Sequence, residues 1–153
     1  MATVDERCVN IGGISTRYVV EGRGSPILLI HGFGEFLEVW GYNISPLSEH
    51  FTVYALDLPG HGLSEEPRAD YTLDYAARFV ADFMKTLEIK RASLVGHSLG
   101  GLLCLKIAID FPDRVDKLIL VDSAGLSNRW PVECSPKLRK LELKLHFAAP
   151  WYS

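Results

Sequence analysis

The chain has 153 residues, of which 48% are hydrophobic and 23% are charged. This balance is typical of one globular domain, or of one domain and part of a second, and excludes a disordered chain. Sixteen Lys and Arg against 19 Asp and Glu give a net charge of −3 without a basic stripe, so we expect no nucleic-acid partner. The first residues lack the apolar region of a signal peptide and no run reaches transmembrane length, so we expect a soluble, cytoplasmic protein without a membrane span.

The cysteines Cys8, Cys104 and Cys134 are odd in number and widely spaced, with no Cys-x-x-Cys pattern. Buried free thiols are therefore a better interpretation than a disulfide or a metal site. No pattern in the sequence predicts a metal ion or an organic cofactor, and we expect neither.

Residues 7–21 contain two short strand-like runs on either side of Gly12 and Gly13, a pair that suits a tight hairpin turn. After a loop, residues 26–31 form an apolar run without alternation. Such a run is typical of a strand buried on both faces of a parallel sheet.

The sequence His-Gly-Phe-Gly at residues 31–34 directly follows this buried strand. Glycine-rich backbone at the carboxyl end of a strand lets main-chain amides approach a ligand closely, as a donor to an oxyanion must. An ordinary strand-to-helix turn is the other interpretation, but Ser98, within the sequence Gly-x-Ser-x-Gly at residues 96–100, favours the functional one. We interpret the His31 side chain as a structural brace of the loop and not as a catalytic base.

Residues 35–50 are predicted to form a loop and a weak helix with Trp40 and Leu47 facing inward. The strand predicted at 51–57 ends in Asp-Leu-Pro-Gly-His-Gly. Asp57 and His61 could suggest catalysis, but hydrogen bonds that hold a Gly/Pro-rich turn are the favoured interpretation.

A helix is predicted for residues 72–87, with Thr72 as its N-terminal cap. Aromatic or aliphatic side chains recur every four residues along one face, at Tyr75, Phe79, Phe83 and Leu87. This spacing indicates a face that packs in the core and not a cofactor-binding box.

Residues 92–108 contain an apolar run, the sequence Gly96-His97-Ser98-Leu99-Gly100 and a second apolar run at helical spacing. Strand, sharp turn and helix form the context that the Gly-x-Ser-x-Gly nucleophile elbow requires. The glycines allow the strand and the helix to approach closely. Ser98 would then lie at the carboxyl end of the strand, next to the amides and the positive dipole of a helix N-terminus, which can stabilise an oxyanion.

Residues 115–122 are predicted to form another buried strand. The composition changes after it, and residues 136–147 are predicted to form an amphipathic helix whose basic side chains suit a solvated face better than a membrane anchor. We therefore divide the chain into a core at residues 1–124 and the beginning of a cap region at residues 125–153.

Alternation of strand and helix from residue 26 to residue 122 predicts an α/β fold with a mostly parallel sheet and helices on both faces. With the motifs at 31–34, 57–62 and 96–101, the chain resembles the N-terminal part of an α/β-hydrolase of the cap-bearing type. That type includes small esterases, C–C bond hydrolases and cofactor-free haloperoxidase-like enzymes. The resemblance covers nearly the whole chain.

The resemblance implies that Ser98 is the nucleophile and that the backbone amides of Phe33 and Leu99 form the oxyanion hole. Epoxide hydrolases and haloalkane dehalogenases of this fold carry an aspartate at the elbow, so a serine implies acyl transfer, ester hydrolysis or serine-assisted C–C cleavage. The implied substrate is a small apolar ester or a related acyl compound.

The triad acid and base that the family places after the serine are not identified in this chain. His146 is the only histidine beyond Ser98, and Asp122 follows a strand, but neither matches the family pattern well. We expect the chain to be the front part of a serine hydrolase with little activity of its own, because a serine without a base is a weak nucleophile. A non-catalytic protein that binds a small ligand or a partner is the alternative. The apolar strand at 115–122 is also expected to leave an unpaired sheet edge, through which the chain could self-associate.

Overall fold

The computed structural model describes residues 5–125, which form a six-stranded sheet with helices on both faces. The strands follow the order β1-β2-β4-β3-β5-β6 across the sheet. Their bounds are β1 (Glu6–Ile11), β2 (Ile14–Glu21), β3 (Ser25–Ile30), β4 (Phe51–Leu56), β5 (Ala92–His97) and β6 (Val115–Val121).

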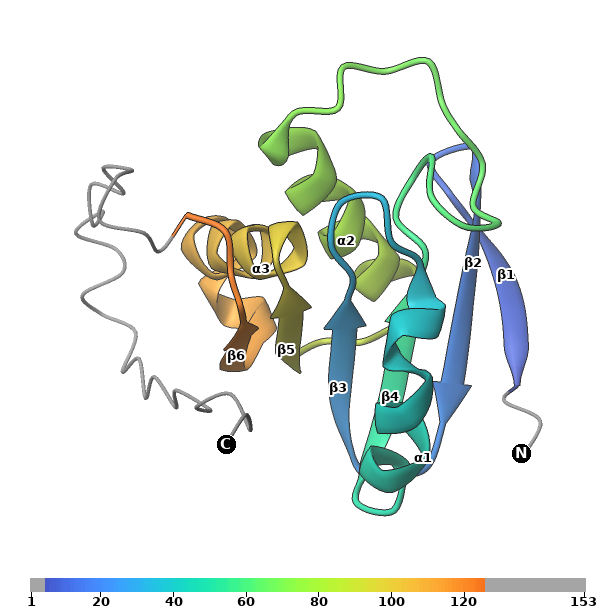
Figure 1. The fold of residues 1–153 in the computed structure, drawn as a ribbon, viewed down its shortest axis with the longest axis vertical. Helices are drawn as coiled ribbons and strands as arrows, with labels where there is room; N and C mark the ends of the chain where they lie inside the picture. Colours follow the sequence, from blue (N-terminus) through green and yellow to red (C-terminus); the bar gives the residue numbers. More distant parts are fainter. Residues whose placement is uncertain (1–4, 126–153) are drawn as a thin grey trace, which may run out of the picture.

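The sheet is mostly parallel, as the sequence predicts. The four strands β4, β3, β5 and β6 pair in parallel, whereas β1 and β2 form a hairpin that adds to β4 in the antiparallel sense. Gly12 and Gly13 form the hairpin turn, both with positive φ. In Figure 1, β3 and β5 point upward, so the loops that follow these two neighbouring strands lie together at the upper end of the sheet.

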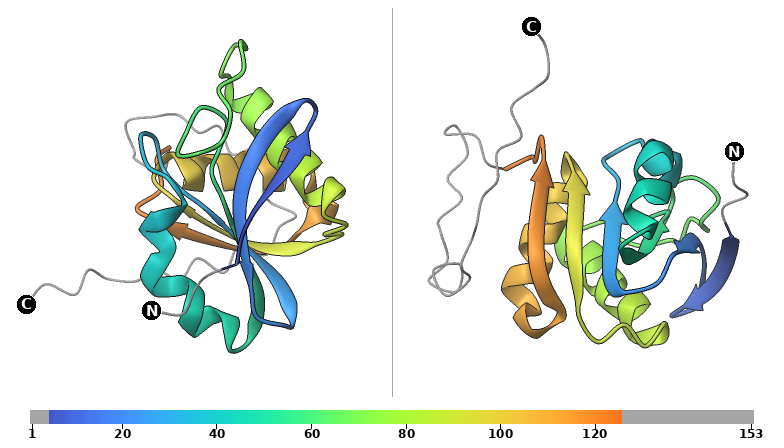
Figure 2. Two further views of the ribbon diagram at one scale, coloured as in Figure 1. Left: turned by 90° about the vertical axis from the view of Figure 1, so that its right-hand side faces the viewer. Right: turned by 90° about the horizontal axis from the view of Figure 1, so that it is seen from below.

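Side chains of β3 alternate between two cores. Ile27 and Leu29 pack with the short helices η1 (Leu37–Trp40) and α1 (Gly41–Ser48), where Trp40 is buried as expected and Leu47 half-buried. Leu28 and Ile30 pack on the other face against α2 and α3. All four side chains are at most 4% exposed, which confirms a strand buried on both faces (Figure 2).

The helices α2 (Leu73–Thr86) and α3 (Leu99–Asp110) contact each other on the larger core. The hydroxyl of Thr72 accepts a hydrogen bond from the amide of Tyr75 at 3.1 Å, which confirms the predicted cap. A single turn of 3₁₀ helix, η2 (Pro112–Arg114), leads from α3 into β6.

The prediction that residues 115–122 form a strand buried on both faces is wrong for β6. Within residues 5–125 it pairs only with β5 at the sheet edge, and its side chains alternate in exposure instead of being buried on both faces. Leu118 and Leu120 pack against the larger core, but Ile119 and Val121 are each 39% exposed. The reason is that no described helix covers the second face of the sheet at this edge.

Cysteine burial corrects a second prediction. Cys104 on α3 is buried and free, and burial raises the pKa of its thiol. Cys8 is also free but exposed, because β1 is the opposite edge strand of the sheet. Cys134, the predicted helix at 136–147 and nearly all of the predicted cap region lie outside the described residues.

Candidate active site

Ser98 connects the end of β5 to the first residue of α3 and adopts φ 50° and ψ −115°. This left-handed conformation is one of three among the described residues other than glycine. Its amide donates to the carbonyl oxygen of Val121 at 3.0 Å, and its own carbonyl oxygen accepts from the amides of Gly101 and Ala124, both at 3.0 Å. Hydrogen bonds from two directions thus hold the strained turn in place, in the geometry of a nucleophile elbow.

The glycines of the motif are required by close packing of the backbone. A Cβ atom on Gly96 would overlap the backbone of Gly100 and Gly101, and a Cβ atom on Gly100 would overlap the carbonyl groups of Ile30 and His31. The first turn of α3 therefore lies directly against the carboxyl ends of β3 and β5.

The loop that follows β3 passes beside Ser98. A Cβ atom on Gly32 would lie 3.2 Å from the Cβ atom of Ser98. Within residues 5–125, the amides of Phe33 and Leu99 donate to no carbonyl or side chain. Leu99 is the first residue of α3, where an amide has no partner within the helix. Two unpaired main-chain donors thus flank the candidate nucleophile.

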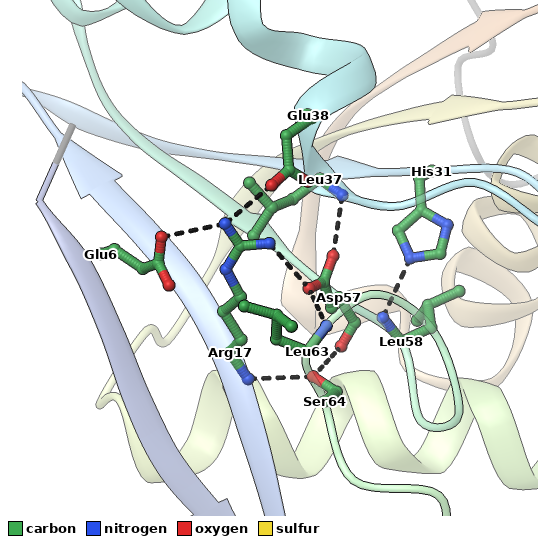
Figure 3. Close-up of polar contacts among 9 residues, drawn as sticks. All are labelled: Glu6, Arg17, His31, Leu37, Glu38, Asp57, Leu58, Leu63 and Ser64. Carbon is green, nitrogen blue, oxygen red and sulfur yellow. Dashed lines mark hydrogen bonds and ion pairs between the residues drawn. The ribbon is translucent and has the colours of Figure 1, made fainter. Parts of the chain in front are cut away.

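His31 braces this loop, as the sequence predicts (Figure 3). Its Nε2 atom accepts a hydrogen bond from the amide of Leu58 at 3.0 Å, so Nδ1 carries the proton and donates to the carbonyl oxygen of Gly32 at 2.8 Å. The side chain is fully buried, and this burial lowers the pKa of His31. The imidazole is therefore neutral and tied to two backbone groups.

The carboxylate of Asp57 organises the turn after β4, which confirms its predicted structural role (Figure 3). It is fully buried and accepts from the amides of Leu37 at 2.8 Å and Leu63 at 2.9 Å and from the guanidinium of Arg17 at 3.3 Å. His61 likewise contacts its own turn, through a 3.0 Å hydrogen bond between Nδ1 and the carbonyl oxygen of Pro59.

No sequence pattern predicts the roles of Arg17 and Glu35. The guanidinium of Arg17 also forms ion pairs with Glu6 at 2.9 Å and Glu38 at 2.7 Å, and thereby joins the hairpin, η1 and the turn after β4. Glu35 contacts both His97 and the amide of Gly32. The only available signal for Glu35 is an acid in the loop after the buried strand, together with a histidine directly before the elbow serine.

A cavity of about 600 Å³ includes the residues of both candidate donors in its wall. Phe33 and Leu99 line it together with apolar residues of the first turns of α2 and α3, among them Leu73, Ala76 and Leu102. Tyr75 also lines the cavity, whereas Phe79 and Phe83 are buried. The predicted aromatic face of α2 therefore packs in the core as expected, except at its N-terminal end.

The described residues do not supply a base for Ser98. Of the histidines they include, His31, His61 and His97 are hydrogen-bonded elsewhere, and His50 is exposed at the far end of the sheet after α1. Asp122 directly follows β6, is exposed and has φ 43°. His146 lies outside the described residues.

Among residues 5–125 there is no cluster of three or more His, Cys, Asp or Glu side chains that could hold a metal ion. None of the helices in this part of the chain combines the length and apolar character needed to cross a bilayer.

The fold and the elbow define an α/β-hydrolase. The family model described as the alpha/beta hydrolase fold matches residues 25–147, and the chain therefore belongs to the alpha/beta hydrolase fold family.

Two curated relatives show which proteins the chain is similar to. The chain is 40% identical over 125 residues to the 2-hydroxy-6-oxo-6-(2'-aminophenyl)hexa-2,4-dienoic acid hydrolase of Metapseudomonas resinovorans, covering 79% of this chain and 43% of that protein. It is 44% identical over 120 residues to the dihydrolipoyllysine-residue acetyltransferase component of the acetoin cleaving system of Cupriavidus necator, covering 78% and 32%.

A solved structure of a serine hydrolase involved in carbazole degradation is similar with a TM-score of 0.77 and 37% sequence identity. The match covers 82% of this chain and 50% of that one. The chain spans between 32% and 54% of the length of eight curated relatives that it matches.

Proposed function

We propose that the protein is a serine hydrolase in which the Ser98 hydroxyl attacks the carbonyl carbon of a small ester or a related acyl or C–C substrate. The attack forms a bond from Oγ to the carbonyl carbon and moves the carbonyl π electrons onto oxygen, while the Oγ proton passes to a general base that residues 5–125 do not supply. The amides of Phe33 and Leu99 would donate to this oxyanion. Its collapse would re-form the C=O bond and break the bond to the leaving group, which takes the proton from the protonated base and leaves an acyl-enzyme. The observation that carries the proposal is the strained backbone of Ser98 beside two main-chain amides, those of Phe33 and Leu99, that have no acceptor within residues 5–125.

The cavity supports an apolar substrate. Leu73, Ala76 and Leu102 line it next to Phe33 and Leu99, so an acyl or alkyl group could bind there while its carbonyl lies at the amides. Hydrolases that act on 2-hydroxy-6-oxo dienoic acids are among the relatives, which is consistent with a carbonyl substrate and a serine-assisted C–C cleavage.

A binding protein without catalysis is the second candidate. It is favoured by one observation: within residues 5–125, the histidines contact groups other than Ser98 or lie at the far end of the sheet. Such a protein would use the cavity but would not need an elbow serine beside two free amides.

Labelling with an alkyl fluorophosphonate separates the two candidates, because the reagent adds covalently to a serine whose oxyanion site is formed. Since residues 5–125 supply no base for Ser98, we expect this labelling to be slow. We expect intact-mass spectrometry to show one adduct, which peptide mapping places on Ser98. Ser98→Ala should remove the adduct, whereas Ser45→Ala, a control on the exposed surface of α1, should keep it. Absence of labelling in the parent chain, or labelling retained in Ser98→Ala, would reject the proposal.

The role of the cavity is tested by varying the alkyl chain of the reagent. Leu102→Trp would fill part of the cavity, so we expect it to slow labelling by a long-chain reagent more than labelling by a methyl reagent. Equal effects on both reagents would place the apolar group of the substrate elsewhere.

A further inference from the structure

One carboxylate oxygen connects the two halves of the candidate site. Oε2 of Glu35 accepts a hydrogen bond from the amide of Gly32 at 2.7 Å and contacts Nδ1 of His97 at 2.9 Å. Gly32 directly precedes Phe33, and His97 directly precedes Ser98. Glu35 therefore links the loop that carries one candidate oxyanion donor to the strand end that carries the candidate nucleophile.

The same residue fixes the orientation of the Phe33 amide. The carbonyl oxygen of Gly32 accepts from the amide of Glu35 at 3.3 Å and from Nδ1 of His31 at 2.8 Å. In a trans peptide the N–H points opposite to the C=O, so holding the Gly32 carbonyl also fixes the direction of the Phe33 N–H. Glu35 thus holds Gly32 on both sides, through its carboxylate and through its amide.

The position of Glu35 is close to the reacting serine but separated from it. The point where a Cβ atom of Gly32 would lie is 2.8 Å from Glu35 Oε2 and 3.2 Å from the Cβ atom of Ser98. The carboxylate and the Cβ atom of Ser98 therefore both border the space beside Gly32 that a side chain would occupy. Partial burial acts to raise the pKa of Glu35, but the hydrogen bonds from His97 and Gly32 outweigh it and lower the pKa, so the group remains a charged acceptor at neutral pH.

We propose that Glu35, anchored by His97, is a positioning residue that holds the Phe33 amide at the distance and angle needed to stabilise an oxyanion on a substrate attacked by Ser98. This inference rests on the proposed function. Glu35 touches neither the nucleophile nor the substrate in this assignment, and it acts through the Gly32–Phe33 peptide.

The test compares two reagents that differ in one atom, a phosphonate with a P=O group and its thio analogue with a P=S group. Sulfur is a weaker hydrogen-bond acceptor than oxygen, so only the P=O reagent benefits strongly from a well-placed amide. Loss of one oxyanion donor slows reactions by roughly 10²–10³-fold. Glu35→Ala would misplace the amide of Phe33 without removing it, so the effect should be smaller. We expect this variant to slow P=O labelling of Ser98 by about tenfold or more, and P=S labelling by no more than about twofold.

Glu35→Gln is the conservative variant, because its amide oxygen can still accept from Gly32. We expect it to restore most of the P=O rate. His97→Ala removes only the anchor of the carboxylate, so it should give a smaller loss with the same preference for P=O. Glu65→Ala is the matched control, since Glu65 also accepts from a backbone amide, that of Ser15 at 3.0 Å, and should change neither rate.

The outcomes separate the two proposals. Loss of both rates by the same factor, or an unchanged P=O rate in Glu35→Ala and His97→Ala, overturns the positioning role while Ser98 stays labelled. If Glu35→Ala does not fold, as judged by circular dichroism, the Gln and His97 variants decide the matter by the same criterion. No labelling of Ser98 in the parent chain is a failure of the proposed function itself.

Discussion

Ser98 has φ 50° and ψ −115°, a region that disfavours any residue with a Cβ atom and suits glycine. A residue held there costs roughly 1–3 kcal/mol, which the hydrogen bonds to Val121 and Ala124 offset. The strain comes from the backbone conformation at position 98 and not from the hydroxyl group. Its free-energy cost can therefore be measured by unfolding, without any substrate.

We expect Ser98→Gly to be more stable than Ser98→Ala by about 1–2 kcal/mol, because only glycine adopts this conformation freely. Urea unfolding followed by circular dichroism measures the difference. At Ser45, inside α1, the order should reverse, with alanine about 1 kcal/mol better than glycine. An elbow site that also prefers alanine would contradict the strained turn.

The buried side chain of His31 makes the free energy of unfolding depend on pH. Burial lowers the pKa of His31 in the folded chain below the ordinary value of 6.5, so the unfolded chain binds a proton more readily. The free energy of unfolding therefore contains a contribution from His31 that is complete above pH 6.5 and is lost as the pH falls toward the lower pKa of the folded state. We expect His31→Gln to have a flatter dependence between pH 5 and pH 8 than the parent chain in urea titrations. Parallel curves for the two proteins would show that His31 is not held neutral.

At this scale the sequence predicts only part of the site. Ser98, His31 and Asp57 are predicted because glycine-rich motifs at strand ends surround them. Glu35 contacts His97, which is 62 residues away in the chain, and Arg17 contacts Asp57, which is 40 residues away. No local pattern reports such contacts. The unpaired amides of Phe33 and Leu99 can be proposed from the motifs, but their proximity to Ser98 requires the folded backbone.

Among the secondary-structure elements, α3 must pack closely against the carboxyl ends of β3 and β5 for the turn at Ser98 to form. Gly100 has no room for a Cβ atom, because the carbonyl groups of Ile30 and His31 occupy that space. One obstacle is the last residue of the central strand β3 and the other is the residue that directly follows it, so neither can move without disturbing the sheet.

We expect Gly100→Ala to lower the free energy of unfolding by about 2 kcal/mol or more, since overlap with backbone exceeds the cost of ordinary overpacking. Gly41→Ala is the matched helical control. A Cβ atom at Gly41 would meet nothing within 4 Å, and the φ of Gly41 is −52°, so this change should be neutral or stabilise by up to about 1 kcal/mol. Thermal or urea unfolding of both variants measures the effects, and equal stabilities would mean that α3 is not packed in this way.

The strand β6 shows where prediction of elements fails. Its Leu-Ile-Leu-Val sequence is apolar on both faces, and the same pattern in β3 correctly predicts a strand covered on both sides. For β6 the described residues cover only the face that carries Leu118 and Leu120. Coverage of the second face depends on the position of a strand in the sheet, which its own sequence does not contain.

The unpaired edge of β6 predicts that the molecule associates with other copies of itself. Within residues 5–125 the outer side of β6 has no pairing strand, and Ile119 and Val121 add exposed apolar surface. Unpaired strand edges are templates for pairing with another chain, and residues 118–121 of β6 carry no charge that would oppose it.

We therefore expect the apparent mass in light scattering to rise with protein concentration. The double variant Ile119→Lys/Val121→Lys should reduce the rise, because charges on an edge strand oppose pairing. Matched lysines at Val39 and Tyr42, exposed residues of η1 and α1, should leave it unchanged. A monodisperse monomer at high concentration would show that this edge is covered.

The central claim is that Ser98 is a nucleophile with the amides of Phe33 and Leu99 as its oxyanion donors. A crystal structure of the phosphonate adduct tests it most directly. We expect phosphorus on Oγ of Ser98 and the phosphoryl oxygen at about 2.7–3.1 Å from both amide nitrogens, with the Gly32–Phe33 peptide oriented as it is here. An adduct on another residue, or a phosphoryl oxygen that points away from both amides, would contradict these roles of Ser98, Phe33 and Leu99.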